Sequence, residues 1–261
     1  ATILYSAGWA DSGDNAEGVE LLVRLAQVTG NIGRDGGGID RLVLEANSQG
    51  AIDVGAMPHL LPGHRALDDT EALSVFEARW QAAVPTTPGL DTAGMLQAAQ
   101  AGTLKAMYVV GTDLVGNAGS GRDHGIAAAL EQLDFLVVQD VFLTETAMLA
   151  DVVLPGVTYV EKDGTFTNLE RRIQRLRVGL KRPGDARPDW QIIQDVANGV
   201  GGKFYYSGPR EIMREIAAVV PAYGGVTYAR LGLKGLQWPC PTLDHPGSTL
   251  LYERPAPVAA R

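Results

Sequence analysis

The sequence predicts an α/β protein built on a parallel β-sheet with helices on both faces, beside irregular and small β segments. Residues 106–110 (AMYVV) form a short apolar run that is typical of a buried strand, and 135–138 and 152–154 are similar runs. Helices are expected between them at 125–133 and 144–150. Because strands and helices alternate at this spacing, we expect right-handed crossovers and parallel strands.

The earlier part of the chain also alternates between strand and helix patterns. Residues 2–5 predict a strand, and apolar side chains recur at the helical period through 15–29. The segment 33–38 contains four glycines in six residues, so the backbone there is expected to turn or to approach another group closely. Further helices are expected at 71–83 and 93–101.

Composition limits the class of protein. With 261 residues, 46% hydrophobic content and a mean hydropathy of +0.01, the chain can bury a sizeable core. No apolar run approaches the roughly 18 residues that a membrane span needs, and the first residues lack the pattern of a secretory signal. We therefore expect a cytoplasmic protein without direct membrane insertion. The formal net charge of -8 argues against a nucleic-acid partner.

Metal-binding residue types are sparse. The single cysteine, Cys240, excludes an intramolecular disulfide and any iron–sulfur cluster held by several thiolates of this chain. The histidines have no metal-ligand spacing; they are His59, His64, His124 and His245. We therefore assign no metal site and no catalytic residue.

Candidate binding residues follow the expected strands. Open parallel sheets bind ligands beyond the carboxyl ends of their strands, and here those ends carry small or polar residues at 111–113, 139–140 and 155–156. Glycine allows close backbone approach, and threonine and aspartate can bond to ribose, base or phosphate groups. The alternative is that these are ordinary turns with capping residues. The residue types leave both interpretations open.

Several motifs occur in the order and spacing of one family. They are Gln139-Asp-Val-Phe-Leu-Thr-Glu-Thr-Ala147, Ala150-Asp-Val-Val-Leu-Pro155, Glu161-Lys-Asp-Gly-Thr-Phe-Thr-Asn168, Glu170-Arg-Arg-Ile-Gln174, Ala186-Arg-Pro-Asp-Trp190 and, earlier in the chain, Thr29-Gly-Asn-Ile-Gly33 and Asn47-Ser-Gln-Gly-Ala51. On these motifs the chain resembles the molybdopterin oxidoreductase family over residues 1–252.

The resemblance implies that the parallel sheet is the Rossmann-like domain of this family and contributes to one half of the pterin-dinucleotide site. The matching residues are Gly111, Thr112, Asp113, Gln139, Asp140, Thr144, Thr146 and Asp163. Molybdopterin guanine dinucleotide is the implied cofactor if the ancestral site is retained. Family members carry iron–sulfur clusters in an upstream region, and many end in a barrel domain. Because we find neither here, we expect this fragment alone to hold no cofactor.

The same pattern suggests five parts of the chain. They are a partial α/β segment continuing a missing upstream domain (1–45), the Rossmann-like domain (46–157), a basic β and loop insertion (158–186), a helix returning to the α/β domain (187–208), and a C-terminal helix with an irregular tail (209–261). Residues 171–182 carry six basic and no acidic side chains. We expect them to form a strand that anchors to another part of the subunit, or alternatively a solvated basic edge.

One departure from the family bears on function. Formate-dehydrogenase-like members carry an arginine four positions before the residue matching Asn47, and here that position is Val43. A neutral side chain cannot orient an anionic substrate as a guanidinium does. The run 45–51 looks most like the G subunit of NADH-quinone oxidoreductase, respiratory complex I.

We therefore expect a vestigial, non-catalytic portion of an electron-transfer subunit of that complex. Its partners would be other subunits of a respiratory redox complex, which would hold it at the cytoplasmic face of the inner membrane. Two alternatives remain. The chain could belong to a catalytic molybdenum enzyme such as a formate dehydrogenase alpha subunit, or it could be a freestanding nucleotide-binding or interaction module.

Overall fold

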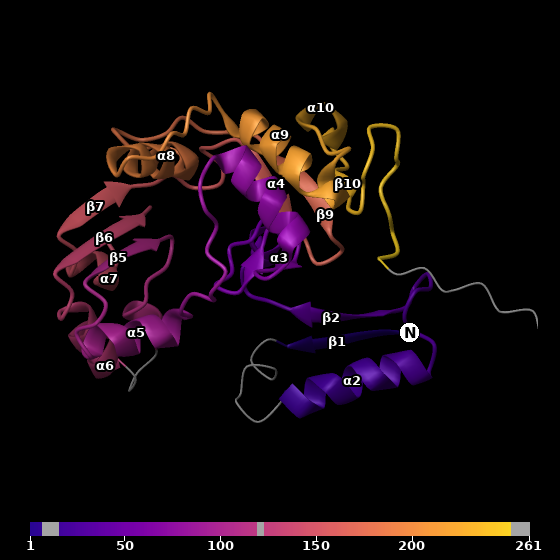
Figure 1. The fold of residues 1–261 in the computed structure, drawn as a ribbon, viewed down its shortest axis with the longest axis horizontal. Coiled ribbons are helices and arrows are strands. Elements are labelled where there is room, and N and C mark those ends of the chain that lie inside the picture. Colours follow the sequence, from indigo (N-terminus) through magenta and orange to yellow (C-terminus); the bar gives the residue numbers. More distant parts are fainter. Residues whose placement is uncertain (7–15, 119–122, 252–261) are drawn as a thin grey trace, which may run out of the picture. The chain divides into compact units, whose positions relative to one another are not determined.

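The computed structural model describes residues 1–6, 16–118 and 123–251. The chain forms two compact units (Figure 1). The first unit contains Ala1–Val84, Thr165–Arg175 and Ile212–Arg261, and the second contains Pro85–Gly164 and Leu176–Glu211. Each unit is therefore assembled from segments that are distant in the sequence.

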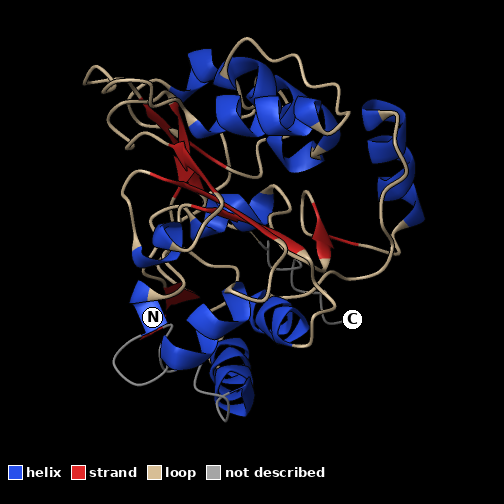
Figure 2. Ribbon diagram, turned by 90° about the vertical axis from the view of Figure 1, so that its left-hand side faces the viewer, coloured by secondary structure: helices blue, strands red, loops and turns tan. Residues whose placement is uncertain are grey.

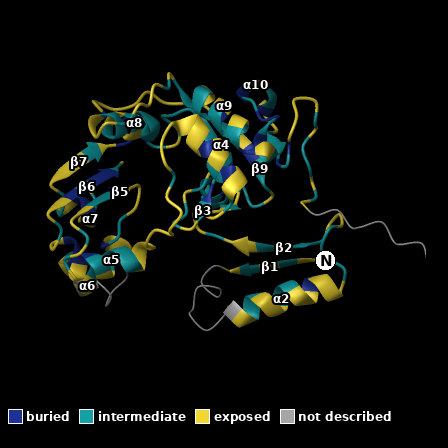
Figure 3. Ribbon diagram, in the orientation of Figure 1, coloured by how far each residue is buried: buried dark blue, intermediate teal, exposed yellow. Residues whose placement is uncertain are grey.

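The second unit is built on a parallel sheet of three strands, β5 (Ala106–Val110), β6 (Phe135–Asp140) and β7 (Val152–Pro155), in the order β5-β6-β7. The central strand pairs Val138 with Val109 on one side and with Val153 on the other. Figure 3 shows β6 as largely buried, as expected for a strand with a neighbour on each edge. The predicted parallel sheet is confirmed.

Helices alternate with these strands, which confirms the predicted α/β class. They are α5 (Thr92–Gln100), α6 (Asp123–Leu130), α7 (Glu145–Met148) and α8 (Asp189–Gly199), with a 3-10 turn at Gly116–Ala118. Apolar side chains from the strands and from α6 and α7 form one core, which includes Leu130, Leu136 and Val138. This core holds the carboxyl ends of the three strands at one edge.

The first unit opens with a β-α-β arrangement. Strand β1 (Thr2–Ser6) pairs in parallel with β2 (Gly38–Leu42), and α2 (Ala16–Val28) lies between them in the sequence. The strand and helix predicted here are confirmed. The glycine-rich segment 33–38 leads directly into β2, and Gly33, Gly36 and Gly38 all have positive φ.

The rest of the first unit combines short strands with helices. Its elements are α3 (Ser48–Asp53), the antiparallel pair β3 (Leu60–Leu61) and β4 (Arg65–Ala66), α4 (Thr70–Trp80), β8 (Gly164–Thr167), β9 (Arg172–Leu176), α9 (Pro209–Val219), a 3-10 turn (Pro221–Tyr223), α10 (Tyr228–Leu231) and β10 (Leu236–Gln237). Strands β8, β9 and β10 form a sheet in the order β10-β9-β8. The hydrophobic core of this part of the first unit includes Ile173, Tyr223, Trp238 and Cys240.

The basic segment 171–182 forms a strand only over Arg172–Leu176. Gly179, Pro183 and Gly184 follow within a few residues, and such residues do not continue a strand. The first residues of the segment pack within the first unit, because the Arg175 guanidinium lies 5.0 Å from the centre of the Tyr228 ring. Lys181 and Arg182 are exposed.

Loops join most of these short elements (Figure 2). The stretch between β9 and α8 contains no helix or strand. Within the described ranges, no helix combines the length and apolar character needed to cross a membrane.

Candidate functional site

The loops at the carboxyl ends of β5, β6 and β7 bring together most of the predicted binding residues. Gly111 follows β5 directly, and its N–H donates to the Gln139 carbonyl at 2.8 Å. Its φ of +64° favours glycine. An added Cβ would meet no atom within 4 Å, so the backbone conformation selects the glycine. The next residue, Thr112, is exposed, and its hydroxyl makes no hydrogen bond to the described residues.

Asp113 and Thr146 bind each other across this edge. The Thr146 hydroxyl donates to Asp113 Oδ1 at 2.7 Å, and the Thr146 backbone N–H donates to the same oxygen at 3.0 Å. The Thr146 oxygen in turn accepts from the N–H of Val115 at 3.0 Å. Burial acts to raise the pKa of Asp113, but the hydrogen bonds from Thr146 and from neighbouring backbone N–H groups outweigh it and lower the pKa. These contacts fix the β5 loop to α7.

Asp140 and Thr144 organise the loop between β6 and α7. Asp140 Oδ1 accepts from the backbone N–H groups of Val141 (2.6 Å) and Phe142 (3.2 Å). Thr144 caps α7, because its hydroxyl accepts from the N–H of Ala147 at 3.2 Å. Both residues therefore have the turn and capping roles that the sequence had left open.

Gln139 is almost fully buried at the end of β6 and belongs to a chain of polar side chains. Its amide nitrogen donates to Asp189 Oδ1 at 2.8 Å, and its amide oxygen accepts from the Tyr108 hydroxyl. The Lys162 ammonium donates a hydrogen bond to the other carboxylate oxygen of Asp189, Oδ2. Burial raises the pKa of Tyr108, and the Asp189 carboxylate raises it further. The network Tyr108–Gln139–Asp189–Lys162 connects four segments of the second unit: β5, β6, the start of α8 and the loop that contains Lys162.

Asp189, Lys162 and Tyr108 were absent from the predicted site. Asp189 starts α8 and lies fifty positions from Gln139 in the sequence. The motif 186–190 contributes to the family resemblance but does not by itself indicate a binding residue. An acidic residue at a helix start usually stabilises the helix, so no local pattern indicated that its carboxylate lies beside β6.

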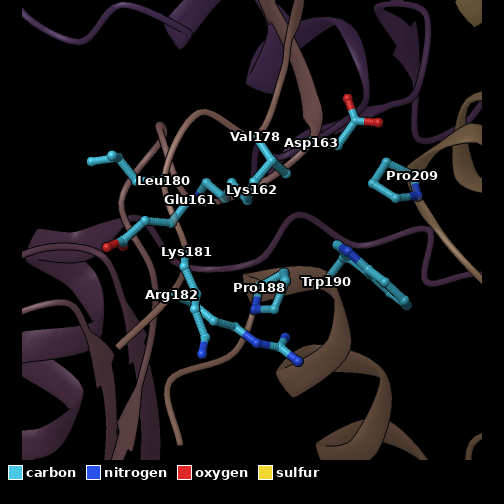
Figure 4. Close-up of a pocket in the computed structure, with 10 residues that line it drawn as sticks. All are labelled: Glu161, Lys162, Asp163, Val178, Leu180, Lys181, Arg182, Pro188, Trp190 and Pro209. Atoms are coloured by element: carbon cyan, nitrogen blue, oxygen red, sulfur yellow. The ribbon is translucent and has the colours of Figure 1, made fainter. Parts of the chain in front are cut away.

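A pocket of about 370 Å³ shares Lys162 with this network. Figure 4 shows the residues that line the pocket. Its lining includes Lys162 and the two residues that flank Asp189, Pro188 and Trp190. Lys181 and Arg182 also line it, and neither forms an ion pair with a described residue. The predicted site residue Asp163 lines the same pocket, and its carboxylate accepts from the N–H of Gly164 at 3.0 Å. The pocket thus combines an indole ring with basic side chains.

A metal centre needs several His, Cys, Asp or Glu side chains close together. Over the described ranges, no group of three or more His, Cys, Asp and Glu side chains could hold a metal ion. Cys240 is fully buried in the core of the first unit. His59 is exposed, and His64 contacts the buried carboxylate of Asp53.

Sequence comparison establishes the family of this chain. The family model described as molybdopterin oxidoreductase matches residues 1–199. The chain belongs to the molybdopterin oxidoreductase family, as the motifs indicated.

Curated relatives define the nearer group. The chain is 43% identical to F420-dependent formate dehydrogenase 2 subunit alpha of Methanococcus maripaludis, over 97% of this chain and 37% of that protein. It is 46% identical to the probable oxidoreductase YjgC of Bacillus subtilis, over 87% of this chain and 23% of that protein. The chain therefore spans between about a quarter and about two fifths of the length of these relatives.

Among solved structures, acetylene hydratase from Pelobacter acetylenicus matches with a TM-score of 0.44 and 20% identity, over 53% of this chain and 19% of that chain.

These relatives overturn the expected assignment to NADH-quinone oxidoreductase. Three proteins named F420-dependent formate dehydrogenase alpha subunits are 40–43% identical over 97% of the chain. The prediction of a vestigial complex I subunit was wrong, and the formate dehydrogenase alternative fits better. Val43 alone does not decide the assignment, because one side chain can change a substrate contact while the rest of the sequence keeps its similarity to these relatives.

Proposed function

We propose that this chain is the portion of a formate-dehydrogenase-type alpha subunit that binds the dinucleotide part of a molybdopterin cofactor. The proposed contact surface is the carboxyl edge of β5, β6 and β7 together with the pocket beside Asp189. The predicted residues belong to this surface, which we extend to Asp189, Lys162 and Trp190. The observation that carries the proposal is the Asp189 carboxylate, held between Gln139 and Lys162 where the sheet edge adjoins the pocket.

The chemistry of these groups fits a dinucleotide. The partly exposed Asp189 carboxylate offers acceptors to a base edge or to ribose hydroxyls. The indole of Trp190 offers an apolar face on which a flat ring can stack. Lys181 and Arg182 offer positive charge to phosphate oxygens. A pocket volume of about 370 Å³ lies within the usual range for small-molecule sites.

When bound, the cofactor would supply the two-electron redox chemistry of the family. The residues of this chain would bind and orient it. Gln139 holds the Asp189 carboxylate in one orientation, and Asp113 and Thr146 hold the β5 loop against α7. Such pre-organisation reduces the ordering that binding must impose on the site.

The subunit organisation and the substrate follow from the relatives. The names of these relatives describe alpha subunits of formate dehydrogenases, so we propose that the protein acts in a redox complex with other subunits and oxidises formate or a related small anion. Because valine occupies position 43, where arginine is expected in formate-dehydrogenase-like members, the affinity of this protein for formate is the property that we expect to differ most from theirs. A freestanding binding module would lack this redox activity.

Cofactor content of the full protein tests the proposal. Pterin is measured by fluorescence after oxidative release, and guanine nucleotide by chromatography after mild acid hydrolysis. We expect both in the wild type. We expect a severalfold lower content in Asp189→Ala and in the double variant Lys181→Ala with Arg182→Ala, because binding groups are lost.

Lys203→Ala is the matched control, since Lys203 is an exposed lysine of the same unit outside the pocket. Thermal unfolding of each variant identifies any general loss of fold. A wild-type protein without releasable pterin would refute the proposal. Full cofactor content in both pocket variants would refute the proposed contact surface.

A further inference from the structure

A second cavity, in the first unit, is lined by two side chains whose backbones are strained. Its volume is about 780 Å³, and its lining includes His64 and Arg171. Both have positive φ, +59° and +61°, which is uncommon outside glycine. Such conformations cost free energy and tend to occur at functional sites. Trp238 lies between them, with its ring centre 5.9 Å from that of His64 and 5.4 Å from the Arg171 guanidinium carbon.

The buried carboxylate of Asp53 orients His64. Asp53 is 1% exposed, and its Oδ1 lies 2.8 Å from His64 Nε2 and accepts from Gln49 Nε2 at 2.7 Å. Its Oδ2 accepts from the Tyr223 hydroxyl at 2.7 Å and from the Trp238 indole N–H at 2.6 Å. Burial raises the pKa of Tyr223, and the Asp53 charge adds to this, so the phenol remains a donor. Both carboxylate oxygens of Asp53 therefore accept hydrogen bonds.

This arrangement determines which nitrogen of His64 a ligand can use. Because Asp53 accepts, Nε2 carries the hydrogen, and Nδ1 of the neutral ring is an acceptor. His64 Nδ1 has no hydrogen-bond partner among the described residues. Protonation of Nδ1 converts it into a charged donor while the contact to Asp53 is kept.

Arg171 is a half-buried cation that lacks a contacting carboxylate among the described residues. Its guanidinium donates to backbone carbonyl oxygens, namely those of Trp238, Ser248 (3.4 Å) and Thr249 (3.0 Å). Burial lowers the pKa of Arg171, and the carboxylates of Asp53 and Asp40 counteract this from a distance. A guanidinium offers five N–H donors, so three carbonyl contacts leave donors for a ligand.

Two acidic side chains share the lining and oppose an anion. Burial raises the pKa of Asp40, Arg171 lowers it, and Glu170 raises it again. The Glu170 carboxylate lies 3.6 Å from the Arg172 guanidinium, which offsets its charge in part. Asp40 belongs to β2 and faces the same cavity as Arg171. The charge that an anion meets in this cavity therefore depends on whether Asp40 is protonated.

We propose that this cavity binds a small oxyanion, which Arg171 holds and which draws a proton onto His64 Nδ1. Arg171 contacts carbonyl oxygens but no carboxylate among the described residues, so a bound oxyanion would supply the negative charge beside it. Protonated His64 would be the second charged donor to the oxyanion. Asp53 is the positioning residue that keeps His64 in place. Carboxylate and phosphate groups share this chemistry. The site is confined to the first unit, so the inference does not rest on the cofactor site proposed in the second.

Isothermal titration calorimetry of the full protein tests the inference, with acetate and inorganic phosphate as separate probes. Each titration is run in two buffers of different ionisation enthalpy, which gives the number of protons taken up. We expect binding of at least one probe with net proton uptake, and weaker binding as the pH rises. The probe that binds identifies the ligand class. We expect His64→Gln to abolish most of the proton uptake, whereas His59→Gln, which changes an exposed histidine outside the lining, leaves it unchanged.

Charge variants separate electrostatics from folding. Arg171→Gln is expected to weaken binding roughly tenfold or more, because charged hydrogen bonds are lost. Asp40→Asn is expected to strengthen binding, because it removes an opposing charge and needs no change of fold. Failure of both probes to bind the wild type would overturn the inference. So would unchanged binding in both Arg171→Gln and Asp40→Asn, or equal proton uptake in His64→Gln and the wild type.

Discussion

The amide nitrogen of Gln139 donates to Asp189 Oδ1 at 2.8 Å, and this contact joins the end of the central strand β6 to the start of α8. Gln139 is 1% exposed. Its amide oxygen accepts from Tyr108 on the neighbouring strand. A single buried side chain thus connects two strands, a helix and, through Asp189 and Lys162, the lining of the adjacent pocket.

The first prediction concerns the stability of this network. In Gln139→Leu, the Tyr108 hydroxyl loses its acceptor and the Asp189 carboxylate loses a donor. Leaving a buried polar group unpaired costs about 1–3 kcal/mol. Tyr108 and Asp189 are only partly buried, so we expect the free energy of unfolding to fall by about 1 kcal/mol, the lower end of that range. Urea denaturation measures it. Gln132→Leu serves as control, because Gln132 is exposed and its side chain makes no hydrogen bond to the described residues. Equal stability of the two variants would contradict the prediction.

The second prediction concerns Thr146, whose hydroxyl bonds both Asp113 and the N–H of Val115. Thr146→Val keeps the shape but removes both contacts, and we expect a loss of about 1–3 kcal/mol at neutral pH. The pKa of Asp113 is lowered in the folded state. The contribution of Asp113 to the free energy of unfolding is therefore fully present above its pKa in the unfolded state, about 4. It is lost as the pH falls through the lower pKa of the folded state.

The stability difference between wild type and Thr146→Val is accordingly expected to narrow below about pH 4. Part of the difference should remain, because the contact to Val115 does not depend on charge. Denaturation midpoints measured from neutral to acidic pH give this comparison. Thr112→Val makes the same change at an exposed threonine and should have little effect at any pH. A difference that grows towards acid would refute the assigned role of Asp113.

The fold was predictable where the signal was local. Strand β5 matches the apolar run 106–110 residue for residue, because a short uninterrupted run between turn residues has one main interpretation. Helix α5 was also predicted within a residue at each end, and Asp91 caps it through the N–H of Gly94 at 2.8 Å. In both cases the residues that determine the element lie next to each other in the sequence.

The sites were harder to predict because their contacts are long-range. Gln139 and Asp189 are fifty positions apart, and Asp53 and Trp238 are 185 positions apart. No periodicity or spacing links such pairs. The sequence did suggest that Asp113, Thr144 and Thr146 lie near one edge of the sheet, but it could not distinguish a ligand contact from the caps and internal hydrogen bonds that the structure contains.

The third prediction concerns metal content. We expect the chain of 261 residues, purified after chelation, to contain less than stoichiometric iron and molybdenum. Its one cysteine, Cys240, is 0% exposed, and its thiol lies 3.4 Å from the His245 carbonyl oxygen, to which it donates. Iron–sulfur clusters need several thiolates. Elemental analysis per chain measures the content, and stoichiometric metal that survives chelation would contradict the expectation.

The fourth prediction concerns Val43, the position at which formate-dehydrogenase-like relatives are expected to carry arginine. In the full protein, we expect Val43→Arg to raise kcat/KM for formate roughly tenfold or more, because a hydrogen bond between charged groups contributes about 1.5–3 kcal/mol and a tenfold change requires about 1.4 kcal/mol. The gain should appear mainly as a lower KM if the guanidinium binds formate equally well before and during the reaction.

The neighbouring residue provides the control for this change. Leu44 is 94% exposed, so Leu44→Arg adds the same charge one position further along the chain, on a solvated side chain. A long-range charge effect would raise activity in both variants and would weaken with added salt, whereas a direct contact would favour Val43→Arg alone and would depend less on salt. Equal kinetics of the two variants would show that position 43 does not reach the substrate, and the formate specificity of this protein would then have to come from other residues.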